Sequence, residues 1–216
     1  MPLLFTKALG QDASLGLWKI DASLNVEDVC PAKIQQKVKT FCKKRKNETA
    51  ATYALLSALL GENDLIIHHD ENGKPLIKGY NISISHTNGY AAILLSRSHN
   101  VAIDIEYISN RVFKVAKVFL TEKENKNIEV SSEGNEDIKR TYLLLHWCAK
   151  ETTYKYFSEQ KLLFNEMEVD LNNEMAAESK GRIHEEGKFI CTNNRKNKNV
   201  IIEYVQNEKY VLTYTL

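Results

Sequence analysis

Two acidic side chains, Asp104 and Glu106, lie two residues apart in the apolar segment Val101–Tyr107. The segment predicts a β-strand, and because side chains alternate along a strand, both carboxylates would lie on one face. Carboxylates held this close repel each other, and a divalent cation relieves the repulsion. Mg²⁺ takes one or two carboxylates together with water and phosphate oxygens. The spacing suits a magnesium site for a phosphate-containing substrate, and it also fits a solvated edge strand.

A second pair of charged side chains, Glu151 and Lys155, lies four residues apart in the segment Trp147–Lys155, which is part of a predicted helix. Such a pair can simply stabilise the helix surface by a few tenths of a kcal/mol. It can also provide Glu151 as a third metal ligand or a general base, with Lys155 beside it to neutralise a phosphate. Neither segment decides between these interpretations alone.

The composition excludes several classes of protein. The chain has 216 residues, 43% of them hydrophobic and 26% charged, which is ordinary for a soluble globular protein. A formal net charge of +1 gives no reason to expect nucleic acid or a membrane surface as a partner. The apolar runs are far shorter than the roughly 18 residues of a membrane span. Charged residues interrupt any N-terminal signal segment, and the cysteines form no CxxC motif, so we expect a cytoplasmic protein with reduced thiols.

The elements that would position these side chains can be read from periodicity. Helical spacing over residues 31–60 predicts two helices, separated by the basic run Lys43–Lys46 and ending at Gly61. Asn72-Gly73 predicts a hairpin turn between short strands. Further strands are expected at residues 81–85 and 90–95.

In the second half, the sequence pattern predicts a helix at 111–119, a capping box at Thr121–Glu124 and a long helix over 136–157. Alternating strands follow at 199–204 and 209–216. We therefore expect an α+β fold with a junction near residue 98.

Three segments in order, NISISHTNG at 81–89, VAIDIE at 101–106 and WCAKETTYK at 147–155, resemble the signature of the 4′-phosphopantetheinyl transferase superfamily. The NGKP segment at 72–75 is similar to the Gly-Lys-Pro element of that family. The length of the chain is similar to that of the longer, two-half subfamily, exemplified by the activators of surfactin synthetase. The holo-carrier-protein synthases have about half this length.

The resemblance implies a pseudo-two-fold arrangement of two similar α+β halves, with the active site at their interface. Residues 1–98 would hold the nucleotide end of coenzyme A, and residues 99–216 would supply the magnesium ligands and the catalytic helix. The implied reaction transfers the phosphopantetheine arm of coenzyme A to a serine of an apo acyl or peptidyl carrier protein, a transient partner, and releases 3′,5′-ADP. Fatty acid, polyketide and nonribosomal peptide pathways all remain open, and a monomer is favoured.

The resemblance also assigns residues to roles. The implied Mg²⁺ ligands are Asp104, Glu106 and Glu151, and the implied catalytic residues are Glu151 and Lys155. The implied contacts with coenzyme A are made by Lys74, Pro75, Ser85, His86, Thr87, Asp104, Glu151 and Lys155.

The sequence departs from the family pattern most clearly in the first main helix, where residues 47–53 lack the arginine expected to bind the 3′-phosphate of coenzyme A. The run Lys43–Lys46 could replace it, although such a run is usually a solvated face. His68-His69 is interpreted as an exposed strand, Glu124 as the acid of its capping box, and Trp147 as a core residue. A Mg²⁺-dependent phosphohydrolase and a non-catalytic module that binds coenzyme A or a carrier protein remain as alternatives.

Overall fold

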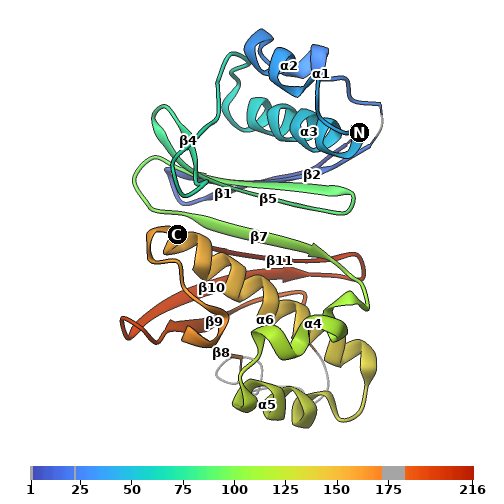
Figure 1. Ribbon diagram of the computed structural model, residues 1–216, viewed down its shortest axis with the longest axis vertical. Helices are drawn as coiled ribbons and strands as arrows, with labels where there is room; N and C mark the ends of the chain where they lie inside the picture. Colours follow the sequence, from blue (N-terminus) through green and yellow to red (C-terminus); the bar gives the residue numbers. More distant parts are fainter. Residues whose placement is uncertain (1, 22, 172–182) are drawn as a thin grey trace. The chain divides into compact units, whose positions relative to one another are not determined.

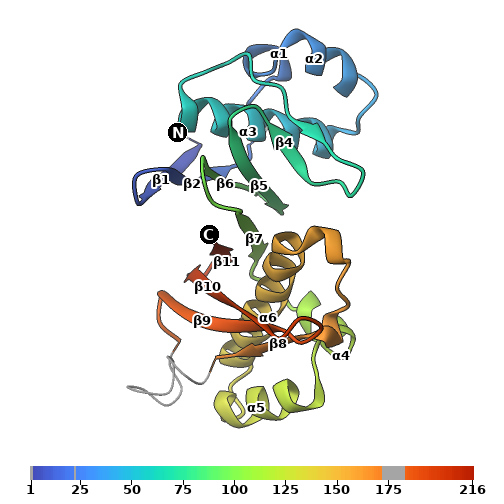
Figure 2. The ribbon, with the colours of Figure 1, turned by 90° about the vertical axis from the view of Figure 1, so that its left-hand side faces the viewer.

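The computed structural model describes residues 2–21, 23–171 and 183–216. It divides into two compact units, Met1–Ile105 together with Leu216, and Glu106–Thr215 (Figures 1 and 2). Each unit has its own helices and sheet, so the chain has a mixed α+β fold, as predicted. The division falls a few residues after the expected junction at residue 98. The similarity of the halves and their pseudo-two-fold relationship stay predictions.

The first unit contains a six-stranded sheet in the order β1-β2-β6-β5-β4-β3. The predicted hairpin at Asn72-Gly73 is present, because Pro75 pairs antiparallel with His69 and Gly73 has a φ of 82°. No strand was predicted for the first thirty residues, where β1 and β2 pair at one edge of the sheet. The strands are β1 (Leu3–Leu9), β2 (Ala13–Lys19), β3 (His68–His69), β4 (Pro75–Ile77), β5 (Tyr80–Thr87) and β6 (Tyr90–Ser96).

Three helices, α1 (Val26–Val29), α2 (Ala32–Val38) and α3 (Lys43–Leu60), lie on one face of this sheet (Figure 1). Helix α3 packs on β2 and β6, and Gly16 of β2 allows the close approach because a Cβ there would lie 2.7 Å from Leu55. The basic run does not separate two helices as predicted. It forms the first turn of α3, whose C-terminus is Gly61 in the left-handed conformation.

The second unit contains a five-stranded sheet in the order β7-β11-β10-β9-β8. Strand β7 (Ala102–Tyr107) carries the last residues of the first unit and the first residues of the second. The predicted strands near 199–204 and 209–216 correspond to β10 (Lys198–Gln206) and β11 (Tyr210–Thr215). Two strands, β8 (Met167–Asp170) and β9 (Glu186–Asn193), were not predicted.

Helix α6 (Glu136–Tyr156) packs along this second sheet, with α4 (Arg111–Phe119) and α5 (Glu122–Ser132) against it (Figure 2). The predicted capping box is present at the start of α5, where Thr121 and Glu124 bond reciprocally to each other's backbone N–H groups. The Asn135 side chain caps α6 by accepting two backbone N–H groups. No helix among the described residues has the length and apolar composition to cross a membrane.

Candidate active site

Asp104 is buried in the first unit, with 5% of its surface exposed. Its Oδ1 accepts a hydrogen bond from the Ser85 hydroxyl at 2.8 Å. The backbone N–H groups of the residues on either side of Asp104 are also fixed by β5, because Ile103 donates to Ser83 and Ile105 donates to Ser85. A solvated edge strand does not describe this environment. Asp104 is a buried carboxylate whose backbone is held on both sides.

Glu106 is half-buried in the second unit, where its Oε1 accepts a hydrogen bond from Trp147 Nε1 at 3.2 Å. The indole is itself held in place by two other rings. Its centroid lies 5.2 Å from that of Phe119 and 5.3 Å from that of Phe164. Trp147 is therefore packed as expected, and it also orients a candidate metal ligand.

Glu151 and Lys155 follow Trp147 on α6 at intervals of four residues, so the three side chains share one face of the helix. Both charged side chains are half-buried. Their neighbours Thr152 and Thr153 are fully buried on another face. Within the second unit, the helix thus aligns a carboxylate and an ammonium group with the ring that contacts Glu106.

The donor set of the three predicted ligands fits Mg²⁺, because Asp104, Glu106 and Glu151 offer hard carboxylate oxygens. Asp104 belongs to the first unit, and the other two acids belong to the second. In the parts of the chain that the structure describes, no three His, Cys, Asp or Glu side chains gather as a metal cluster. The metal site stays a prediction that rests on the chemistry of the donors.

A pocket of about 440 Å³ opens in the first unit between α2, α3 and the strands β3–β5. The predicted coenzyme A contacts Pro75 and His86 both line it. Basic side chains gather at the same pocket, namely Lys37, Arg45 and His69. The pocket is therefore a partly open hollow in which Lys37 and Arg45 outweigh the charge of Glu48.

The positive charges at the pocket affect the pKa of His69. Partial burial lowers this pKa first, and the positive charges of Lys37 and Arg45 lower it further. His86 also lines the pocket, and its Nε2 lies 2.6 Å from the Thr52 hydroxyl. Because that hydroxyl donates its proton to the Glu48 carbonyl, His86 Nε2 is the donor in the second bond.

The other predicted coenzyme A contacts are not brought to this pocket. The Lys74 ammonium donates to Asn100 Oδ1 at 2.9 Å. Ser85 is buried against Asp104. Thr87 is buried and lines a second hollow, of about 360 Å³, together with Lys43 and Lys44. Pro75 and His86 thus share one pocket, and Lys74, Ser85 and Thr87 do not line it.

Sequence reasoning missed His69 as a pocket residue, and it left the role of Arg45 open. Arg45 belongs to the basic run for which both phosphate binding and a solvated face were considered, and its guanidinium lies over the Phe41 ring at 5.0 Å. His69 is exposed in an edge strand, as predicted, and yet it also borders the pocket. The basic run was a usable signal, but only the fold shows that Arg45 is the member of the run that lines this pocket.

A sequence model of the 4′-phosphopantetheinyl transferase superfamily matches residues 100–215, which is just over half of the chain. The chain belongs to this superfamily. The matched region contains the three acids Asp104, Glu106 and Glu151. Membership supports phosphopantetheinyl transfer as the general activity of the chain. No curated protein matches the chain in a sequence comparison.

Proposed function

We propose that the chain transfers the 4′-phosphopantetheine arm of coenzyme A to a serine of an apo acyl or peptidyl carrier protein, as holo-carrier-protein synthases do. One observation carries the proposal. The region matched by the superfamily contains a carboxylate, Glu106, that is oriented by Trp147 one helical turn before Glu151. Carboxylates that can hold a metal ion and an ammonium group that can neutralise phosphate oxygens recur in enzymes of phosphoryl transfer.

In this proposal Asp104, Glu106 and Glu151 hold Mg²⁺. The bound ion would neutralise oxygens of the pyrophosphate as charge develops on them. Burial favours the binding of a cation at Asp104, because a carboxylate with little access to water gains most from a positive partner. The Ser85 hydroxyl occupies one oxygen of Asp104 and fixes its orientation.

The reaction forms a bond between the serine oxygen of the carrier and the β-phosphorus of coenzyme A. It breaks the bond from that phosphorus to the bridging oxygen, which leaves with the electron pair on 3′,5′-ADP. Glu151 takes the serine proton as general base. Lys155, one turn further along α6, neutralises the pyrophosphate oxygens as the bond breaks.

The pocket in the first unit is the proposed site for the nucleotide end of coenzyme A. Its volume of about 440 Å³ lies within the usual range for small-molecule pockets. Arg45 and Lys37 provide positive charge for a phosphate, and an arginine can bind one in a bidentate manner. Pro75 and His86, two residues assigned to coenzyme A by family resemblance, lie at the same pocket.

The decisive experiment incubates the protein with coenzyme A, Mg²⁺ and an apo carrier protein, and measures the carrier mass. Transfer adds about 340 Da, the approximate mass of the arm as a covalent modification. No increase with fatty acid, polyketide or peptide carriers would contradict the proposal. Release of 3′,5′-ADP without a carrier would favour a hydrolase, and binding of coenzyme A without either product would favour a binding module.

A further inference from the structure

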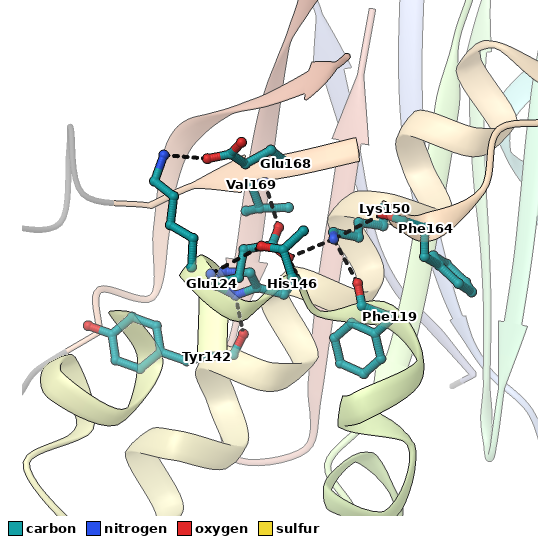
Figure 3. A network of polar contacts seen from close by, with 10 residues as sticks. Phe119, Glu124, Tyr142, His146, Lys150, Phe164, Glu168 and Val169 are labelled. Atoms are coloured by element: carbon teal, nitrogen blue, oxygen red, sulfur yellow. Dashed lines mark hydrogen bonds and ion pairs between the residues drawn. The ribbon is translucent and has the colours of Figure 1, made fainter. Parts of the chain in front are cut away.

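A buried ion pair lies immediately before Glu151 on α6. Lys150 and Glu124 contact each other at 2.7 Å, and their side chains are 0% and 1% exposed (Figure 3). The Lys150 ammonium has an acceptor for each of its three protons, because it also donates to the carbonyl oxygens of Phe119 at 2.7 Å and Phe164 at 3.1 Å. All three protons of the buried ammonium group are donated to protein acceptors, so Lys150 is not available to bind a phosphate.

Both carboxylate oxygens of Glu124 likewise accept hydrogen bonds from protein donors. Its Oε2 also accepts the Thr121 backbone N–H at 2.7 Å, and its Oε1 accepts the Val169 backbone N–H at 2.8 Å. One ion pair therefore ties α6 to the end of α4, the start of α5 and strand β8. Burying two charges gives little net stability, because desolvation offsets most of their attraction. A role in fixing geometry explains the network better than a role in stability.

The two carbonyl acceptors of Lys150 belong to Phe119 and Phe164, the residues whose rings contact Trp147. Trp147 in turn donates its Nε1–H to Glu106. A continuous set of contacts thus runs from the buried ion pair, through two aromatic residues, to the indole and then to a carboxylate. Each contact lies within the second unit.

We propose that Lys150 and Glu124 are positioning residues, which hold Phe119 and Phe164 so that Trp147 fixes the orientation of Glu106. The role of Glu106 as a metal ligand rests on the proposed function. The orientation of Trp147 does not, so it can be tested separately. Groups that orient metal ligands through hydrogen bonds typically change metal affinity about 10–100-fold when they are removed.

The test uses a protein with Trp18→Phe, in which Trp147 is the only remaining tryptophan of the two in the sequence. Two variants disrupt the ion pair, Lys150→Met and the double substitution Glu124→Gln with Lys150→Met, which leaves no buried charge unpaired. Both should shift the Trp147 emission to longer wavelength and lower its anisotropy. They should also raise the Mg²⁺ concentration for half-maximal transfer about 10-fold, with a smaller change in kcat at saturating Mg²⁺.

Lys123→Met is the matched control, because Lys123 forms an exposed ion pair with Glu168 that also links α5 to β8. It should leave the emission and the Mg²⁺ dependence unchanged. A further variant, Trp147→Phe, keeps an aromatic ring at this position and removes the donor to Glu106, so it should reproduce the shift in Mg²⁺ dependence.

Three results would overturn the inference. One is a folded Lys150 variant with unchanged Trp147 emission, and another is an unchanged Mg²⁺ dependence in Trp147→Phe. The third is loss of folding in both Lys150 variants, which would assign the pair to stability alone. A wild-type protein that transfers no arm would contradict the proposed function, while the emission measurement would still test the positioning of Trp147.

Discussion

Ser85 donates its hydroxyl proton to Asp104 and at the same time accepts the backbone N–H of Ile105. The hydroxyl therefore fixes both the carboxylate and the strand that carries it. The family resemblance assigned Ser85 to the nucleotide end of coenzyme A. In this structure the Ser85 hydroxyl contacts Asp104 and the strand that carries it. The role of Ser85 can therefore be tested separately from that of the pocket residues.

Ser85→Ala should weaken Mg²⁺ binding and destabilise the first unit. It removes the donor to a buried carboxylate and the acceptor of a buried N–H, and such unsatisfied groups cost about 1–3 kcal/mol. Ser83→Ala is the control, because Ser83 accepts the Ile103 N–H at 3.1 Å in the same strand. Urea unfolding and Mg²⁺ titration of transfer measure the two effects. Equal Mg²⁺ dependence in the two variants would contradict a special role for Ser85.

Arg45→Gln should weaken binding of coenzyme A more than binding of dephospho-coenzyme A. The pocket gains its positive charge from Arg45 and Lys37, and the 3′-phosphate is the group that the second ligand lacks. Isothermal titration calorimetry of both ligands measures the difference. Lys46→Gln is the control, since Lys46 is in the same basic run and does not line this pocket. An equal loss of affinity for both ligands would show that Arg45 does not bind the 3′-phosphate.

The strand that carries Asp104 and Glu106 and the helices of the second half could be predicted because their signals are local. The alternation of Val101–Tyr107 predicts β7, and the capping box predicts the start of α5. The long helix over 136–157 ends within one residue of α6. In each case the deciding interactions are between residues close in the chain, which a periodic pattern or a cap records directly.

The remaining features depend on contacts between distant residues. Lys150 looks like one more polar helix residue, and only the fold brings Glu124, Phe119 and Phe164 to its ammonium group. The place of Arg45 at the pocket depends likewise on how α3 packs on its sheet. Edge strands such as β1, whose burial pattern is weak, carry little periodic signal at all.

Glu151→Gln should lower the rate of transfer by about 10²–10⁴-fold, the usual contribution of a general base. The fold should persist, because Glu151 is half-buried on α6 and an amide has nearly the same shape as a carboxylate. The increase in carrier mass over time measures the rate of transfer, and circular dichroism measures whether the fold persists. Glu159→Gln, at an exposed acid in the 3₁₀ turn after α6, should keep near-normal activity. A Glu151→Gln variant with near-normal transfer would remove Glu151 from the mechanism.

The stability of the second unit should fall in acid because of His146. Burial lowers the pKa of this imidazole, an effect that the nearby Lys150 charge reinforces and that the Glu124 carboxylate and a hydrogen bond to the Tyr142 carbonyl oppose. Its Nδ1 lies 2.8 Å from that carbonyl, so the neutral ring carries its proton on Nδ1 (Figure 3).

Below about pH 6.5 the unfolded chain binds a proton at this position, whereas the folded chain does not. The free energy of unfolding should therefore decrease as the pH falls, by at most about 1.4 kcal/mol per pH unit from this group. His146→Gln, which keeps a hydrogen-bond donor, should reduce that slope, and His184→Gln, at an exposed histidine, should not. Urea unfolding between about pH 5 and 8, followed by Trp147 fluorescence in the Trp18→Phe protein, measures the slopes. Identical slopes in the two variants would show that acid sensitivity arises at another group.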